Sequence, residues 1–139
     1  MPLTWNIDTG QRLMTMVTDG DVTFAEVNAC LDAHADGDTL SYRKLYDGSR
    51  GYTSMTPEEL MAIGWRIRNY HGSAKVGPLA VVFAPDKMEQ MSRIMGMLAS
   101  ADRPMRVFVD VEKAREWLSK QSDDSSSWPP QKRPMAKAG

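Results

Sequence analysis

The sequence has little of what a disulfide framework, a metal site or a nucleic-acid surface requires. Its 139 residues include one cysteine and two histidines, and its 17 lysines and arginines are balanced by 18 aspartates and glutamates. One cysteine cannot close a disulfide within the chain, and the histidines have no second ligand at metal-binding spacing. A net charge of −1 leaves no basic footprint for nucleic acid. We therefore expect no bound metal or cofactor and no nucleic-acid partner.

Membrane-directing features are also missing. No apolar run approaches the roughly 20 residues of a membrane-spanning helix, and the N-terminus lacks the charged, apolar and small-residue order of a signal peptide. We expect a cytoplasmic protein in which Cys30 stays reduced. Because Cys30 lies at helical spacing from Val27 and Leu31, we interpret it as a small core residue, with a reactive thiol as the alternative.

The composition changes near Gln121. From there to the C-terminus the chain is rich in serine, proline and charged residues, and Trp128 is its only aromatic residue. We predict that residues 1–120 form a single domain, which suits a chain of this length, and that residues 121–139 form a disordered tail. A peptide motif around Trp128 is the functional alternative for the tail.

The pattern of apolar residues predicts an α/β fold. Alternating or continuous apolar residues predict five strands, which span 3–8, 12–18, 41–46, 78–84 and 105–109. Capping residues followed by apolar residues at three- and four-residue steps predict four helices, which begin at Thr23, Thr56, Asp86 and Asp110. The first two strands, joined by Thr9 and Gly10, form a hairpin, and strands joined through helices lie parallel. The prediction is a five-stranded mixed sheet with strands two to five parallel, the first antiparallel, and 78–84 as the central strand.

Two predicted helices carry apolar stripes. The helix from Thr56 has Met61 and Trp65 beside its main stripe, which makes the stripe wide enough to pack on a sheet; the main stripe is Leu60, Ile63, Ile67 and Tyr70. The next helix has an inner stripe of Met88, Met91, Met95 and Leu98. We expect both stripes to be core, with a soft binding surface as the alternative for the methionines.

The stretch 40–60 is where a function would most easily sit. We predict a strand, then a polar loop with the sequence Asp47, Gly48, Ser49, Arg50 and Gly51, and then a helix capped by Thr56. In parallel sheets ligands bind at the carboxyl ends of the strands, and the amides of a helix start attract anions. An ordinary structural cap is the alternative interpretation.

An enzyme is the least supported class. Asp47 ends a parallel strand as a phosphoacceptor aspartate would, but no acidic pair follows the first strand, and Asp110 stands after the last strand where a lysine is needed. No set of serine, histidine and acid indicates nucleophilic catalysis. We therefore expect a protein that is not an enzyme.

Several features together resemble the SpoIIAA-like, or STAS-like, family. These are the order of elements, the strand-turn-strand from Trp5 to Gly20, Asp47 at the end of the third strand, and the closing Ala114-x-x-Trp117-Leu118, over about residues 3–120. The resemblance implies a regulatory module. Anti-anti-sigma members bind a kinase partner and are switched by phosphorylation of a serine just before the second helix, in an Asp-Ser-Ser-Gly motif. For other members, lipid or small-ligand binding is suggested by fold similarity.

This chain departs from that serine motif. Asp47 is followed by Gly48 and Ser49, and the helix begins later, at Thr56. If a serine is phosphorylated, Ser49 is the first candidate by position and Ser54 the second. A phosphate adds about two negative charges, here beside Arg50 and the helix start.

Two functional hypotheses remain. The first is a non-enzymatic regulatory module that binds a protein partner, of kinase or anti-sigma type, through the loop after the third strand and the following helix; the loop residues are Asp47, Gly48, Arg50, Gly51 and Thr56. The alternative is a binding module for a small anionic or lipid ligand at the same helix start. The edge strand of the hairpin is compatible with a homodimer.

Overall fold

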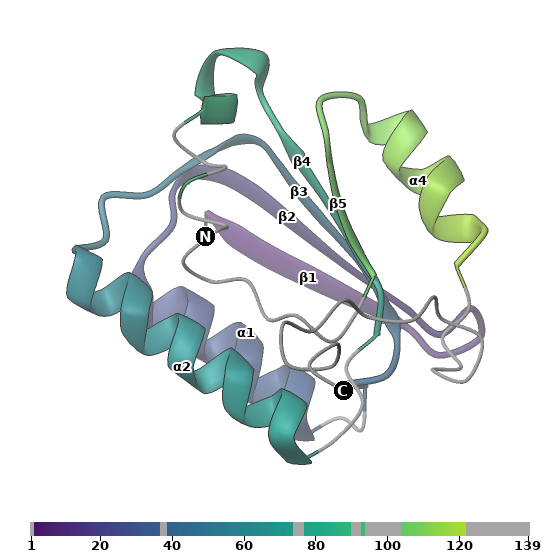
Figure 1. Cartoon of the computed structure of the whole chain (residues 1–139), viewed down its shortest axis with the longest axis horizontal. Coiled ribbons are helices and arrows are strands. Elements are labelled where there is room, and N and C mark those ends of the chain that lie inside the picture. The colour runs from purple at the N-terminus through teal and green to yellow at the C-terminus, as the bar shows by residue number, and fades with distance from the viewer. Residues whose placement is uncertain (1, 37–38, 74–76, 90–92, 94–103, 122–139) are drawn as a thin grey trace, which may run out of the picture.

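A five-stranded sheet forms the centre of the fold. The computed structural model describes residues 2–36, 39–73, 77–89, 93 and 104–121 (Figure 1). The strands follow one another across the sheet in chain order and are β1 (Leu3–Asp8), β2 (Leu13–Asp21), β3 (Arg43–Tyr52), β4 (Leu79–Phe83) and β5 (Met105–Phe108). β1 is antiparallel to β2, and all other neighbours are parallel. The predicted mixed α/β sheet is confirmed.

Helices cover both faces of this sheet. α1 (Phe24–Asp36) and α2 (Pro57–Ser73) lie side by side on one face, and α4 (Val111–Ser119) lies on the other (Figure 1). The helix predicted over 88–98 lies mostly outside the described residues. Its expected cap, Asp86, lies inside the 3₁₀ turn η1 (Pro85–Lys87), whose N-cap is Ala84. That prediction was wrong because Pro85, which suits a first helical position, starts the turn one residue earlier.

The predicted caps of α1 and α4 are confirmed. The amide of Thr23 donates to Glu26 Oε1 at 3.1 Å, and the amide of Glu26 donates to Thr23 Oγ1 at 3.2 Å. At α4 the amide of Glu112 donates to Asp110 Oδ1 at 2.8 Å. These bonds satisfy amides that have no partner within the helix, so the side chains fix where each helix begins.

Two strand predictions need correction. β1 and β2 are joined by Thr9–Arg12 rather than by two residues. The strand at 78–84 is not the central one, since β3 is the middle strand and β4 lies next to the edge strand β5. All five residues of β4 are nevertheless buried. Apolar cover on both faces therefore produces the continuous apolar run, whichever position the strand takes in the sheet.

The core has two sides with different chemistry. On the α4 side the buried residues are all aliphatic: Leu45, Ala80, Val82, Ala114 and Leu118. On the other side the first buried cluster contains Leu3 of β1, Met14 of β2 and Cys30 of α1, together with Val22 from the connection between β2 and α1. β4 contributes Leu79, Val81 and Phe83. Cys30 is 4% exposed, which confirms it as a core residue. On the α4 side of β1, the side chains of Thr4, Asn6 and Asp8 remain exposed.

Candidate functional site

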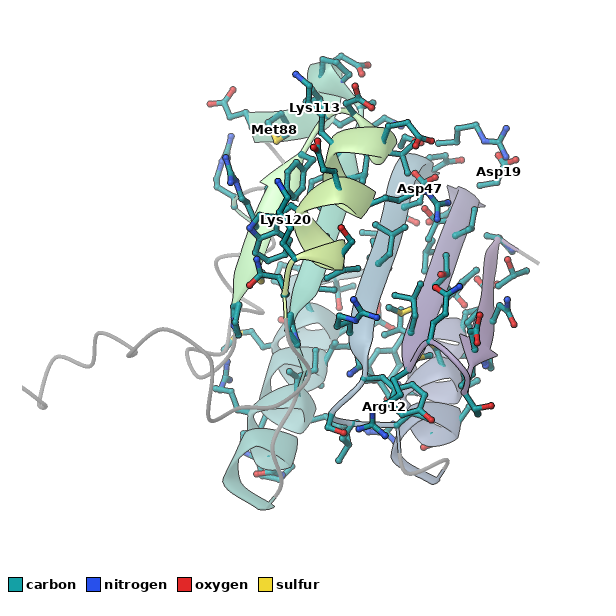
Figure 2. All side chains as sticks on the ribbon, turned by 90° about the vertical axis from the view of Figure 1, so that its right-hand side faces the viewer. Arg12, Asp19, Asp47, Met88, Lys113 and Lys120 are labelled. Carbon is teal, nitrogen blue, oxygen red and sulfur yellow. The ribbon has the colours of Figure 1, made fainter. Side chains whose placement is uncertain are left out.

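The predicted polar loop is largely part of β3. The last pair between β3 and β4 is Gly48 with Phe83, whereas Arg50–Tyr52 pair only with Asp19–Asp21 of β2. The two strands therefore continue as a two-stranded arm beyond β4, and the prediction that β3 ends at Tyr46 was wrong. In Figure 2 Asp47 and Asp19 lie together at the end of the sheet opposite Arg12. The remaining loop is Thr53–Thr56.

Close packing explains the two glycines near this end of β3, Gly48 and Gly51. A Cβ atom on Gly51 would overlap the side chain of Thr18, and a Cβ on Gly48 would lie 3.0 Å from Tyr46 Cε1 and 3.1 Å from the carbonyl oxygen of Val82. The ladder between β2 and β3 is irregular between Val17 and Asp19, at the position of this contact. Both glycines thus serve the close approach of two strands rather than a turn.

Asp47 is hydrogen-bonded to Ser49, the first phosphoacceptor candidate. Its Oδ1 accepts hydrogen bonds from the hydroxyl of Ser49 at 2.7 Å and from the amide of Ser49 at 3.2 Å. The backbone carbonyl of Asp47 accepts from Thr18 Oγ1 at 3.3 Å. Ser49 is half-buried within the strand. Asp47 and Ser49 therefore form a local turn motif inside the strand.

The cationic side chains of this region lie at its surface. Arg50 pairs with Asp19 at 3.3 Å, and both side chains are about 70% exposed. Such a solvated pair contributes little stability, roughly 0–1 kcal/mol. Lys87 Nζ donates to the carbonyl of Gly51 at 3.4 Å and lies 5.1 Å from the centre of the Tyr52 ring. These contacts hold η1 against the end of the arm.

The second phosphoacceptor candidate, Ser54, is exposed and bound to Asp21. The hydroxyl of Ser54 donates to Asp21 Oδ2 at 2.6 Å, and its amide donates to Asp21 Oδ1 at 3.0 Å. The neighbouring Thr53 Oγ1 donates to the carbonyl of Val22 at 2.7 Å. One carboxylate thus anchors the loop before α2 to the end of β2.

The start of α2 has the predicted capping box. The amide of Thr56 donates to Glu59 Oε1 at 3.0 Å, and the amide of Glu59 donates to Thr56 Oγ1 at 3.1 Å. Glu58 and Glu59 lie in the first turn. Because two amides are already bonded and two carboxylates offset the positive end of the helix, this helix start is poorly suited to an anionic ligand.

Two large apolar side chains of α2 face solvent. Met61 is 60% exposed and Trp65 is 63% exposed, whereas Leu60 and Ile63 are buried. The expectation that Met61 and Trp65 widen the inner stripe was wrong. α2 packs on α1, and the guanidinium of Arg66 on α2 donates a hydrogen bond to Asn28 Oδ1 on α1 at 2.7 Å. Because α2 contacts a helix rather than a broad sheet surface, only a narrow stripe of its side chains is covered.

Buried polar groups near the sheet have structural roles. Lys44 is 3% exposed, and its Nζ donates to the carbonyls of Leu40 at 2.6 Å, Tyr42 at 2.7 Å and Thr39 at 3.2 Å. It therefore clamps the turn before β3, a role that sequence reasoning missed because the carbonyls belong to a turn formed only in the fold.

Cys30 and Tyr46 are both held in their neutral forms. Burial raises the pKa of the Cys30 thiol to about 11. Burial, with the nearby Cys30, raises the pKa of Tyr46 to about 12. A thiol reacts as the thiolate, so Cys30 is not activated as a nucleophile at neutral pH.

The described residues contain neither a group of metal ligands nor a membrane-spanning helix. There, no three side chains of histidine, cysteine, aspartate or glutamate are grouped so that they could hold a metal ion. Among the helices of the same residues, none is long and apolar enough to cross a bilayer.

Comparison with known proteins identifies the domain. A family model described as SpoIIAA-like matches residues 13–119, which covers β2 through α4. A search of curated proteins gave no match. SpoIIAA-like domains are generally non-catalytic regulatory modules.

Proposed function

Because the chain belongs to the SpoIIAA-like family, we propose that it is a non-enzymatic regulatory module that binds a protein partner beside the start of α2. The binding surface in this proposal, the α2 surface, consists of Ser54, Thr56, Met61 and Trp65. It joins the loop after β3 to the outer face of the helix. The other residues expected at the site, Asp47, Gly48, Arg50 and Gly51, lie in the last part of β3, which leads into this loop.

The exposed pair Met61 and Trp65 is the observation that carries this proposal. The two side chains lie one helical turn apart on α2, and each exposes more than half of its surface. An aromatic side chain of this size buries about 150–250 Å² in a contact, and tryptophan is enriched among residues that dominate binding energy. Methionine adapts to different partner surfaces. An exposed apolar pair beside a polar loop is typical of an interaction site.

A phosphate on Ser54 would switch this surface. The Ser54 hydroxyl lies 2.6 Å from Asp21 Oδ2, so a phosphoserine would place about two negative charges against that carboxylate. The repulsion would release the loop from β2 and move Thr53–Thr56 relative to Met61. Ser49 is the second candidate in the structure, because its hydroxyl is half-buried and bonded to Asp47. Exposure thus favours Ser54, in contrast to the order that the sequence motif favours.

The partner hypothesis is tested with a photo-crosslinking residue at Met61. Crosslinking in the host cell should give a defined adduct, and the Trp65→Ala change should reduce its yield at least tenfold, since tryptophan contacts at the centre of an interface are worth about 2 kcal/mol or more. The matched control is Lys113→Gln on α4, an exposed residue on the opposite face. An adduct whose yield is the same with Trp65→Ala as with Lys113→Gln would contradict the proposal.

The switch is tested separately by mass spectrometry. Protein isolated from the host cell, or treated with candidate kinases and ATP, should gain one phosphate that maps to Ser54. Ser54→Ala should remove the gain, while Ser49→Ala should keep it. A phosphate on Ser49 alone would reverse the order of the two serines, and no phosphate on either would leave partner binding without this switch.

The alternative ligand hypothesis has less support. The amides of Thr56 and Glu59 are occupied by the capping box, and Glu58 adds a further carboxylate at the point where an anion would bind. Native mass spectrometry of freshly purified protein distinguishes the two hypotheses. A stoichiometric small-molecule adduct would favour the ligand, and an adduct-free mass favours the protein partner.

A further inference from the structure

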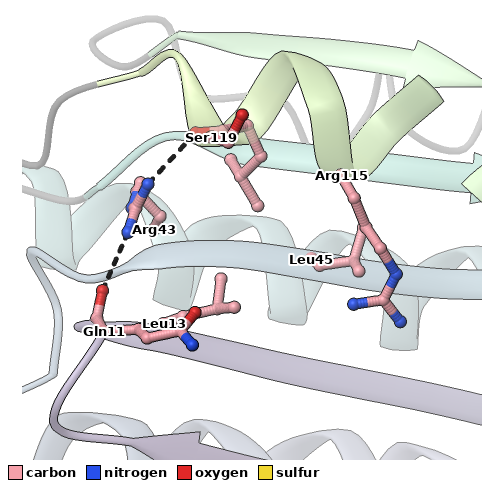
Figure 3. Close-up of a pocket in the computed structure, with 7 residues that line it drawn as sticks. Gln11, Leu13, Arg43, Leu45, Arg115 and Ser119 are labelled. Carbon is pink, nitrogen blue, oxygen red and sulfur yellow. Dashed lines mark hydrogen bonds between the residues drawn. The ribbon is translucent and has the colours of Figure 1, made fainter. Parts of the chain in front are cut away.

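A half-open pocket lies on the other face of the sheet, beside α4. Its volume is about 250 Å³, and it is bounded by β2, β3 and α4 (Figure 3). The apolar floor consists of Leu13, Leu45 and Leu118, and Arg43 and Arg115 stand at its two sides. α4 does not extend over β1, where Thr4, Asn6 and Asp8 are exposed, so the pocket opens toward that side of the sheet.

The two arginines make the pocket cationic. Arg43 is held in place by hydrogen bonds from its guanidinium to the carbonyl of Gln11 at 2.8 Å and to the carbonyl of Leu118 at 3.4 Å. Both acceptors are neutral, so the charge of Arg43 is not compensated by them. Arg115 is exposed and makes no hydrogen bond or ion pair with any other residue that the structure describes. A guanidinium has five N–H donors and matches a carboxylate well.

The chain itself supplies acidic residues next to this pocket. α4 ends at Ser119, and the amides of Lys120 and Gln121 donate to the carbonyls of Trp117 and Leu118 at 3.1 and 3.0 Å. The described chain is thus held at the edge of the pocket as far as Gln121. Asp123 and Asp124 follow within three residues, and Trp128 four residues later.

The distances suit a contact within one chain. Arg115 lies one helical turn before Ser119, which is about 6 Å along the axis. An extended chain advances about 3.3–3.6 Å per residue, so Asp123 and Asp124 can reach about 7–11 Å beyond Gln121. Trp128 can reach more than twice as far and so can reach the half-buried Leu13. A short tether gives an effective concentration in the millimolar range, which makes weak ion pairs sufficient.

We propose that this pocket binds the acidic segment 122–128 of the same chain. Asp123 and Asp124 pair with Arg115 and Arg43, and Trp128 lies against Leu13, the half-buried leucine of the pocket. The contact is intramolecular, depends on ionic strength and leaves the α2 surface on the other face free. It is independent of the proposed partner site.

A spin label in the full chain tests this contact. A nitroxide on Ser126→Cys can be attached selectively, because the only native thiol, Cys30, is buried and has a pKa raised to about 11. The label should broaden the methyl signals of Leu13, Leu45 and Leu118 and leave those of Leu60 and Ile63, beneath α2, sharp. Uniform broadening, or none at the three leucines, would overturn the proposal.

Charge variants of the labelled full chain make the test specific. Arg115→Gln, or Asp123→Asn with Asp124→Asn, should remove at least half of the broadening, and high salt should do the same. The matched controls are Lys113→Gln on the same helix and Lys132→Gln with Arg133→Gln in the tail, which should keep it. Controls that behave like the pocket variants would show a nonspecific charge effect and overturn the proposal.

A mixing experiment identifies the source of the segment. Isotope-labelled protein without nitroxide is mixed with unlabelled protein that carries the nitroxide. Sharp leucine signals in this mixture support the intramolecular contact. Broadening of the same size as in the doubly labelled chain would assign the segment to a second copy and overturn it.

Discussion

α2 and α4 are helices of the same domain that use their apolar residues in opposite ways. In α4, Ala114 and Leu118 are buried, and the ring of Trp117 lies 5.9 Å from that of Phe108 on the sheet. In α2, Trp65 points to solvent, and the helix is held mainly through α1. The difference shows that α4 stabilises the sheet directly, whereas α2 keeps an apolar surface available.

The largest effect is expected from Leu118→Ala. Leu118 is 3% exposed and closes the aliphatic cluster under α4, so its truncation should lower the free energy of unfolding by about 2–5 kcal/mol. Urea denaturation followed by circular dichroism measures this change. A loss below about 1 kcal/mol would mean that α4 is not a stabilising element.

The second largest loss of stability is expected at alkaline pH, from two groups on the α1 side of the sheet. Cys30 and Tyr46 have pKa values raised to about 11 and about 12, above their unfolded values of 9.0 and 10.0. The folded state therefore holds the protons of these two groups more tightly than the unfolded state does. The stability that this difference contributes is complete below about pH 9 and is lost as the pH rises through the two raised values. Each pKa unit of difference corresponds to about 1.4 kcal/mol.

The pH effect is measured by urea denaturation at pH 8 and pH 10.5. Stability should fall, and Cys30→Ala should make the fall smaller. Methyl signals of Val22 and Val27 should broaden before those of Leu45 and Leu118, because the described cluster under α4 is aliphatic. Simultaneous broadening at both faces would contradict the distinction between them.

A smaller loss, about 1–3 kcal/mol, is expected from Gly51→Ala. The added methyl group would overlap the side chain of Thr18 on the neighbouring strand β2. Gly10→Ala is the control, because its Cβ would meet only Asp8 Oδ1 at 3.4 Å, an ordinary contact. The double variant Thr18→Ala with Gly51→Ala should recover part of the loss. If the double variant instead loses as much stability as the two single variants added together, the overlap with Thr18 is not the cause.

Thr56→Ala should cost about 1 kcal/mol, because it removes the hydroxyl that accepts from the amide of Glu59. Thermal unfolding gives the change. Thr56→Ser keeps the acceptor and should stay within a few tenths of a kcal/mol of the native chain. Equal losses in both variants would show that the hydroxyl is not the cause.

The smallest effect on stability is expected from Trp65→Ala. Since Trp65 is 63% exposed, the free energy of unfolding should change by no more than about 0.5 kcal/mol. The same denaturation experiment as for Leu118→Ala measures it. A loss comparable to that of Leu118→Ala would place Trp65 in the core and remove the main support for the α2 surface.

The β2–β3 arm shows where prediction from sequence reached its limit. Asp47, Gly48, Ser49, Arg50 and Gly51 have the composition of a turn, yet they lie within β3 because β2 continues beside them to Asp21. Strand pairing with a distant segment thus overrides local turn preference. The exposed Trp65 was missed for a related reason, since the width of the covered stripe depends on the element that α2 packs against.

The sequence by itself determined the α/β order of elements, the position of Cys30 in the core and the helix starts at Thr23, Thr56 and Asp110. These features depend on hydrogen bonds and apolar spacing within a few residues. Only the tertiary structure decided that β3 is the middle strand, that its arm extends to Tyr52, and that Arg43 and Arg115 face one pocket. Each of these depends on contacts between residues far apart in the chain, and local pattern does not encode which distant segment a residue will meet.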